Sequence, residues 1–128
     1  MLSFCKKYAS TCQYPSSFVF LPEMRHEKLP EFYQSIHLFV LPSVFEGFGC
    51  VYTEAWACGT PFIGCKGQGI EDVLDDDGRA MWLAAAFDAD DLAEKILFYM
   101  NNRPIQLLAC EIDILRLCKR FIGEVNLR

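Results

Sequence analysis

Residues 38–65 decide the fold, and they read LFVLPSVFEGFGCVYTEAWACGTPFIGC. The stretch opens with an apolar tetrad, residues 38–41, and closes with a second apolar run, residues 61–65. Apolar runs without polar alternation indicate strands that are buried on both faces, as in a parallel sheet. Between them, residues 50–58 have the composition of a helix, and Gly59 stands where a helix commonly ends. The stretch therefore predicts a β-α-β unit.

The same patterns extend this unit in both directions. Residues 18–21 form another apolar run, which predicts a buried strand, and residues 28–36 carry apolar side chains at helical spacing. The elements expected further on are a short helix at 70–74, a turn at 75–78, a weaker strand at 81–84, a helix capped by Asp88, and a helical segment at 104–122. We predict an α/β fold with an open, doubly wound parallel sheet of the Rossmann-like kind.

Composition limits what such a domain can do. The chain has 128 residues, enough for one domain, so residues 1–128 are taken as a single domain. Its net charge is −5 and no basic stripe is visible, which argues against a nucleic-acid partner. The longest uncharged run, residues 8–22, is too short and too polar to span a membrane, and the first lysines follow the apolar residues, unlike in a signal peptide. A cytoplasmic protein is expected.

The chain has seven cysteines, an odd number without any C-x-x-C pair. Disulfide frameworks and zinc sites need even numbers or close paired spacings. We therefore expect buried thiols in a reducing compartment, and no metal site.

The loop at residues 42–49 has the composition of a ligand-binding loop. In doubly wound sheets, ligands bind beyond the carboxyl ends of the strands. Gly47 and Gly49 remove side chains where the backbone must approach a bulky group or take a positive φ. The amides of residues 49–52 would then be unpaired donors at the start of a helix, where a diphosphate can bind.

Glu46 and Glu54 stand eight positions apart and would flank this anion site from opposite ends. Two carboxylates repel a diphosphate, but they accept hydrogen bonds from vicinal hydroxyls. A nucleotide sugar carries hydroxyls on both sides of its diphosphate. The arrangement therefore asks for one carboxylate on the sugar and one on the ribose, as an acidic residue holds the ribose in dinucleotide-binding folds.

In these residues the chain resembles the retaining glycosyltransferases of family 4, which have the GT-B fold. The string from Glu46 to Gly49 together with that from Glu54 to Pro61 resembles the family's E-x7-E signature. The flanking segments that look like the family's pattern are residues 18–22, 29–33, 38–43, 67–73, 77–78 and 88–93. The likeness covers about residues 18–101, so the chain resembles most of the C-terminal, nucleotide-sugar-binding domain of such an enzyme.

The resemblance implies roles for individual residues. The donor-binding set that it implies is Glu46, Gly47, Phe48, Gly49, Val51, Tyr52 and Glu54. Glu46 would be the catalytic residue that holds hydroxyls of the transferred sugar, with backbone amides of residues 47–49 beside it. The amides of Val51 and Tyr52 would meet the diphosphate, and Glu54 would bind the ribose. No cofactor and no obligatory metal is implied.

Three further residues are candidates for contacts with the base or the phosphates. Arg25 lies in a loop where the family usually cradles the base, and Lys66 and Gly67 begin the loop after residue 65. The alternatives are a solvated lysine at position 66 and a plain turn at position 67. Met81 and Ala86 stand where the family usually has Gly and Pro, which implies a locally altered turn.

The activity implied is transfer of a hexose-type sugar, with retention, from a nucleoside-diphosphate sugar to a glycan or lipid-linked acceptor in polysaccharide biosynthesis. The family's acceptor-binding N-terminal half, and the first strand and helix of its donor half, have no counterpart in this sequence. One alternative is a non-catalytic, truncated or split-enzyme module that needs a partner chain or self-associates. Another is a nucleotide-binding regulatory domain, which would need Glu54 but not Glu46.

Overall fold

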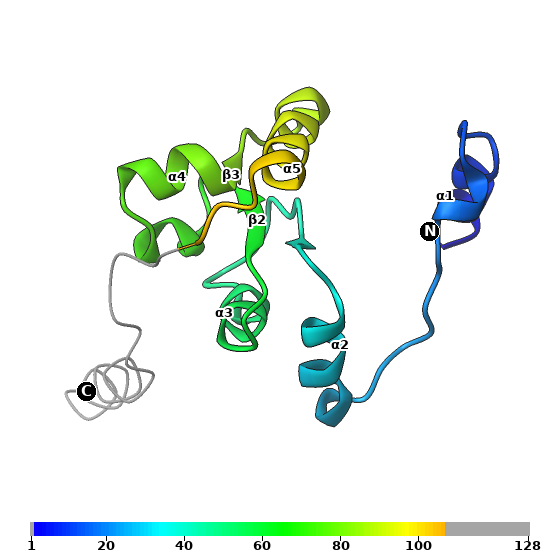
Figure 1. The fold of residues 1–128 in the computed structure, drawn as a ribbon, viewed down its shortest axis with the longest axis horizontal. Coiled ribbons are helices and arrows are strands. Elements are labelled where there is room, and N and C mark those ends of the chain that lie inside the picture. The colour runs from blue at the N-terminus through cyan, green and yellow to red at the C-terminus, as the bar shows by residue number, and fades with distance from the viewer. Residues whose placement is uncertain (1, 107–128) are drawn as a thin grey trace.

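The computed structural model describes residues 2–106, in which a three-stranded parallel sheet lies among helices (Figure 1). The strands, in their order across the sheet, are β1 (Phe39–Val40), β2 (Phe62–Cys65) and β3 (Leu83–Ala84). Phe39 is paired with Phe62 and Gly64 with Leu83, each in parallel register. This arrangement confirms the predicted α/β fold with an open parallel sheet.

Five α-helices and three short 3-10 helices are found among the described residues. The α-helices are α1 (Leu2–Ser10), α2 (Leu29–Ser35), α3 (Cys50–Ala57), α4 (Asp76–Trp82) and α5 (Ala89–Asn102). The 3-10 helices are η1 (Pro15–Ser17), η2 (His26–Lys28) and η3 (Gly69–Val73). The helices predicted near 28–36, 50–58 and 70–74 are thus confirmed, whereas α1 had not been predicted.

The cap predicted for the long helix α5 is confirmed. The Asp88 carboxylate accepts hydrogen bonds from the amides of Asp90 and Asp91, which lack partners inside the helix. The helix expected to restart at Pro104 does not begin there, because residues 104–106 are not helical, and the rest of segment 104–122 lies outside the described residues.

The core is built around β2, all four residues of which are buried. The other members of the buried cluster come from α3, η3 and the residue that follows it, α4, β3 and α5, and they are Tyr52, Ile70, Val73, Leu74, Trp82, Leu83 and Tyr99. At the start of β2, the Gln106 side chain accepts a hydrogen bond from the Phe62 amide at 2.9 Å and donates one to the Phe62 carbonyl at 3.0 Å. This side chain satisfies backbone groups that a further strand would otherwise pair.

The turn predicted at residues 75–78 is wrong. Asp75 is instead the N-cap of α4, and its carboxylate accepts a hydrogen bond from the Gly78 amide at 2.7 Å. Aspartate favours both turns and helix starts, so its presence alone does not distinguish the two. Because α4 extends to Trp82, only Leu83 and Ala84 of the strand predicted at 81–84 are extended.

The buried strand predicted at residues 18–21 is also wrong. These residues are exposed and unpaired, with Val19 78% exposed, and they belong to the chain that runs from α1 to α2 away from the sheet (Figure 1). An apolar run indicates a need for burial, but a strand also needs a neighbour that offers backbone hydrogen bonds. Within residues 2–106, no strand lies beside this run.

The described cysteines, at positions 5, 12, 50, 58 and 65, form no disulfide with one another. Only Cys65 is buried, and burial raises the pKa of its thiol. The expectation of buried thiols is therefore wrong for Cys5 and Cys50, which are exposed. Among residues 2–106, no helix has the length and apolar character that crossing a bilayer requires.

Candidate functional site

The predicted donor-binding residues gather at the junction between β1 and α3, and Tyr52 locks this junction to the core. The Tyr52 side chain is fully buried, and its hydroxyl donates a hydrogen bond to the Leu41 carbonyl at 2.7 Å, just beyond β1. Gly49 precedes α3 with a φ of +68°, and a Cβ added there would lie 2.7 Å from the Tyr52 ring. Only glycine fits this position, because a side chain would be strained and would also collide with the ring.

The pKa of Tyr52 is raised to about 12, mainly by burial and to a smaller extent by the neighbouring Cys65 and Glu46. The hydroxyl therefore stays protonated and remains a donor to the Leu41 carbonyl.

The loop at residues 42–49, called the motif loop below, is held in place by a second loop, the one that follows β2. The Gln68 side chain accepts a hydrogen bond from the Glu46 amide at 2.8 Å and donates one to the Val44 carbonyl at 3.2 Å. The Gly69 amide donates to the Gly47 carbonyl at 3.0 Å, and a Cβ on Gly69 would lie 2.6 Å from that oxygen. Gln68 was not among the residues predicted to matter; the signal for it is a single amide side chain between two glycines, after the neighbouring strand.

Glu46 lies partly exposed in the motif loop, with its backbone fixed by Gln68. Among residues 2–106, no side chain donates a hydrogen bond to its carboxylate. Gly47 and Phe48 follow at the exposed tip of the loop. The backbone of Glu46 is thus fixed, while its carboxylate remains free to accept hydrogen bonds from a ligand.

Glu54 lies in the second turn of α3, with 36% of its side chain exposed. The Tyr33 hydroxyl of α2 donates to Glu54 Oε2 at 3.4 Å, and His26 Nε2 of η2 lies 3.6 Å from Glu54 Oε1. Burial, followed by the nearby Glu54 carboxylate, raises the pKa of Tyr33. Neither Tyr33 nor His26 had been predicted to take part in the site.

The start of α3 offers fewer free amides than the sequence suggested. The Tyr52 amide donates to the Gly49 carbonyl at 3.0 Å, so it is already used within the first turn. Within the described part of the chain, the amides of Cys50 and Val51 have no acceptor. These two groups, at the positive end of the helix dipole, are the donors that an anion could reach.

The three secondary candidates lie in different places. Arg25 is exposed and directly precedes His26, so it is on the Glu54 side of the junction. The Lys66 amide continues the ladder with β3 by donating to the Ala84 carbonyl at 2.9 Å, and the charge of the Lys66 side chain helps lower the pKa of Asp91 on α5. The Gly67 amide donates to the Glu71 carboxylate at 2.9 Å and is therefore used inside its own loop.

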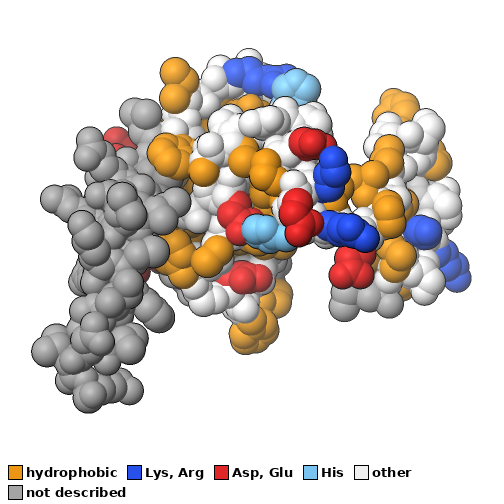
Figure 2. Space-filling view, turned by 90° about the horizontal axis from the view of Figure 1, so that it is seen from below, with side chains coloured by type: hydrophobic (Ala, Val, Ile, Leu, Met, Phe, Trp, Pro, Cys, Tyr) orange, Lys and Arg blue, Asp and Glu red, His pale blue; other side chains and the backbone are white. Residues whose placement is uncertain are grey.

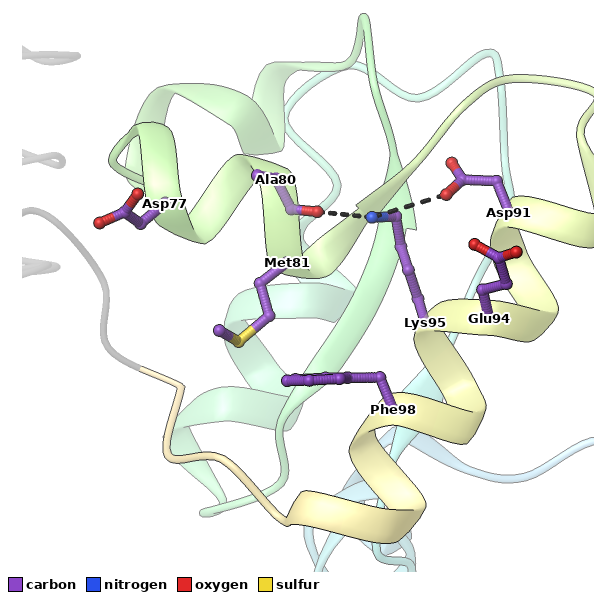
Figure 3. A pocket seen from close by; sticks show the side chains of 7 residues that line it. All are labelled: Asp77, Ala80, Met81, Asp91, Glu94, Lys95 and Phe98. Carbon is purple, nitrogen blue, oxygen red and sulfur yellow. Dashed lines mark hydrogen bonds and ion pairs between the residues drawn. The ribbon is translucent and has the colours of Figure 1, made fainter.

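Several cavities lie near the sheet in the described part of the chain, and the following three are not lined by the predicted donor residues. One, of about 390 Å³, lies at the start of β2 beside Pro61 and Gln106. A second, of about 300 Å³, lies at the carboxyl ends of the strands and is lined by Pro42, Val44, Cys65, Ala84, Ala85, Phe87, Asp88, Ala89 and Leu92. A third, of about 510 Å³, lies between α4 and α5 (Figure 3). There Lys95 Nζ donates to the Ala80 carbonyl at 2.5 Å and lies 3.7 Å from Asp91 Oδ1, so its charge is already paired. In residues 2–106, His, Cys, Asp and Glu side chains nowhere gather in threes as metal ligands would.

The family and the individual proteins to which the chain is similar are all described as glycosyltransferases. The family described as Glycosyl transferases group 1 matches residues 2–111. The chain is similar to the D-inositol 3-phosphate glycosyltransferase of Mycolicibacterium smegmatis, with 35% identity over 69% of this chain and 20% of that protein. It is also similar to the lipopolysaccharide core biosynthesis mannosyltransferase LpsB of Rhizobium meliloti, with 30% identity over 80% of this chain and 30% of that protein.

A plant protein, the sulfoquinovosyl transferase SQD2 of Arabidopsis thaliana, is 30% identical over 66% of this chain and 17% of its own length. The chain therefore spans less than a third of the length of each of these relatives.

Proposed function

The chain belongs to the glycosyl transferases group 1 family, and on that premise we propose that it supplies the donor-binding half of a glycosyltransferase. The donor would be a nucleoside-diphosphate sugar, and the complete enzyme would transfer a hexose-type sugar, with retention, to a glycan or lipid-linked acceptor. Within the family we place the chain among the enzymes of family 4 with an E-x7-E signature, as part of the C-terminal domain of a GT-B fold. We place the enzyme in the cytoplasm and expect it to need no obligatory metal.

One observation carries the proposal: two glutamates, one held through its backbone amide and the other through its carboxylate, stand before and after free amides along the chain. Glu46 is held through Gln68, Glu54 contacts Tyr33, and the Val51 amide between them has no acceptor among the described residues. Carboxylates accept from the vicinal hydroxyls of sugar and ribose, whereas helix-start amides donate to phosphate oxygens. This order of acceptor, donor and acceptor matches the order of groups in a nucleotide sugar.

The proposed catalytic contribution is electrostatic. When the sugar leaves, negative charge develops on the nucleoside diphosphate, and donors that already point at it stabilise that charge. The amides of Cys50 and Val51 would act in this way, while Glu46 would hold the hydroxyls of the transferred sugar. Transfer also requires that donor and acceptor are held together. Because the chain spans less than a third of its relatives, we assign acceptor binding to residues outside it.

A second candidate is a donor-binding module without catalytic activity, which is completed by a partner chain or associates with itself. The observation that favours it is the series of exposed apolar side chains before α2 (Figure 2). Apolar surface of this extent is typical of a region that another protein surface covers.

Isothermal titration of the chain with UDP, GDP and ADP, and with their hexose conjugates, tests the proposal. We expect weak binding of one nucleotide. Glu54→Ala should weaken binding of the nucleotide and of its sugar conjugate alike, by about tenfold or more, because a hydrogen bond to a charged group is lost. Glu46→Ala should weaken binding of the sugar conjugate more than binding of the bare nucleotide.

The matched control is Glu94→Ala, which removes an exposed acid of α5 far along the chain from the motif. It should leave both affinities unchanged. Equal binding by the wild type and by both motif variants would exclude the proposed donor site.

A further inference from the structure

The two oxygens of the Glu54 carboxylate lie in very different surroundings. Oε2 accepts from the hydroxyl of Tyr33, a residue that is only 3% exposed. Oε1 faces His26, whose side chain is 81% exposed. One oxygen is therefore held from the inside of the protein, and the other is reached from solvent.

Tyr33 is fixed by contacts that do not involve Glu54. Its ring packs edge-on against Phe39 of β1, with ring centroids 5.4 Å apart. Its carbonyl accepts a hydrogen bond from the buried Thr60 hydroxyl at 2.6 Å. Among residues 2–106, the Tyr33 hydroxyl has Glu54 as its single hydrogen-bond partner. The core thus presents this hydroxyl to the carboxylate from a set position.

Burial decides which of the two contacts orients Glu54. The His26 contact is exposed, so it competes with water and contributes little, as exposed polar contacts generally do. A hydrogen bond at a partly buried site is stronger, because less water competes for the carboxylate. At 3.4 Å the Tyr33 contact is long, as hydrogen bonds of binding sites often are before the ligand is bound, and it can shorten when the ligand arrives.

On the basis of the proposed function, we propose that Tyr33 is a positioning residue that holds Glu54 through Oε2, so that Oε1 receives the ribose hydroxyls. In this arrangement the ribose replaces His26, whose contact is the exposed one. Without the hydroxyl, the carboxylate would turn about its terminal torsion, which is intrinsically broad. Selectivity for a ribose with both hydroxyls would then fall, although Glu54 itself is still present.

The test compares the affinity of the chain for a nucleoside diphosphate with its affinity for the 2′,3′-dideoxy analogue of the same nucleotide. The nucleotide is whichever of UDP, GDP and ADP the wild-type chain binds most tightly in calorimetric titration. The ratio of the two affinities measures the contribution of the ribose hydroxyls. Because both affinities come from one sample, the ratio does not depend on the folded fraction of a variant.

We expect the wild type to prefer the ribose form and Tyr33→Phe to lower affinity for that form by about tenfold, the loss of one hydrogen bond to a charged group. Binding of the dideoxy analogue should hardly change. The matched control is Tyr99→Phe, which removes another buried tyrosine hydroxyl, one that donates to the His37 carbonyl at 2.7 Å. It should leave the ratio at the wild-type value.

A double-mutant cycle separates positioning from a general effect on the fold. If Tyr33 acts through Glu54, adding Tyr33→Phe to Glu54→Gln should not lower the ratio further. Should Glu54→Gln reduce the ratio while Tyr33→Phe keeps it at the wild-type value, the positioning role is wrong and the proposed function stands. A wild-type ratio near one, no binding at all, or an unchanged ratio in Glu54→Gln would overturn the proposed function and this inference together.

Discussion

Residues 18–21 and strand β2 look alike in the sequence, yet they end in opposite environments. Both are short, largely apolar runs, and both were predicted to be buried strands. All four residues of β2 are buried, with β1 on one side and β3 on the other. Residues 18–21 are exposed and have no strand beside them within the described chain.

The difference extends to the whole segment before α2. Its exposed large apolar side chains are Leu2, Phe4, Tyr8, Tyr14, Phe18, Val19, Phe20, Leu21 and Met24. Figure 2 shows apolar side chains on this part of the molecule, at the right of the view, which is also where Figure 1 places α1. An apolar run thus indicates that a segment would gain from burial, whereas the presence of neighbouring strands decides whether it is buried. The apolar runs of the α/β body, which begins at α2, are buried or half-buried, whereas those of the N-terminal segment, residues 2–28, are exposed.

The largest expected difference between the two regions is in stability. Ile63 of β2 is completely buried, so Ile63→Ala should lower the free energy of unfolding by about 3 kcal/mol. Val19→Ala should change it by less than about 0.5 kcal/mol, because Val19 is exposed. Urea denaturation followed by circular dichroism measures both. Equal losses would show that residues 18–21 are packed in solution, and the comparison would fail.

A second pair of variants tests whether the backbone of the motif loop is as firmly fixed as that of the α/β body. Gly49→Ala should cost about 2–3 kcal/mol, because alanine would be strained at φ +68° and its Cβ would collide with the Tyr52 ring. Gly47→Ala is the control, since a Cβ at Gly47 meets nothing within 4 Å. The same denaturation experiment applies, and a Gly49→Ala variant as stable as Gly47→Ala would show that the loop is loose.

The parts of the fold that could be predicted are those specified by neighbouring residues. The apolar runs of β1 and β2, the helix between them and the cap at Asp88 all rest on local patterns, and all are found. The cap at Asp75 was missed because aspartate serves turns and helix starts equally well. The unpaired run at 18–21 was missed because strand pairing depends on segments far away in the sequence.

In the candidate site too, local sequence patterns predicted some features, and contacts between distant residues were missed. Spacing and glycine content placed Glu46 in the loop and Glu54 in the helix, where the structure has them. The residues that hold them, Gln68 and Tyr33, lie about twenty positions from their partners and touch them only because of how the chain crosses over. No local pattern carries such contacts.

A fall in pH should destabilise the α/β body and leave residues 2–22 unaffected, since these residues contain no Asp or Glu. The hydrogen bond from the Ala85 amide, helped by Lys95 and Lys66, holds the pKa of Asp91 below its ordinary value of 3.8. A lowered pKa stabilises the fold above the unfolded-state value, and this stability is lost as pH falls through the folded-state pKa. Asp91→Asn should therefore cost about 1–2 kcal/mol at pH 7 and less below pH 3.8.

Denaturation at pH 7 and at about pH 3 measures this change, with the exposed Asp90→Asn as the control. An equal cost for Asp91→Asn at both pH values would assign the effect to packing rather than to charge.

The smallest effect on stability, and a clear effect on association, is expected from the N-terminal segment itself. We expect the chain to associate beyond a monomer, because its exposed apolar side chains favour contact with another surface. Replacing Val19 and Leu21 together by serine should reduce association and leave the free energy of unfolding unchanged, since both side chains are exposed. Light scattering at several concentrations checks the mass. A monomeric wild type would show that this apolar surface does not cause the chain to associate.

The order of the strands has a consequence for how the chain acquires its fold. Neighbours in the sheet are also consecutive in the chain, and Phe39 meets Phe62, and Gly64 meets Leu83, across only about twenty residues. Contacts between residues close in sequence form rapidly, because little loop-closure entropy is lost. During synthesis on the ribosome, each strand can therefore dock as soon as it emerges, and β2 never has to wait for a later strand to be inserted between it and β1.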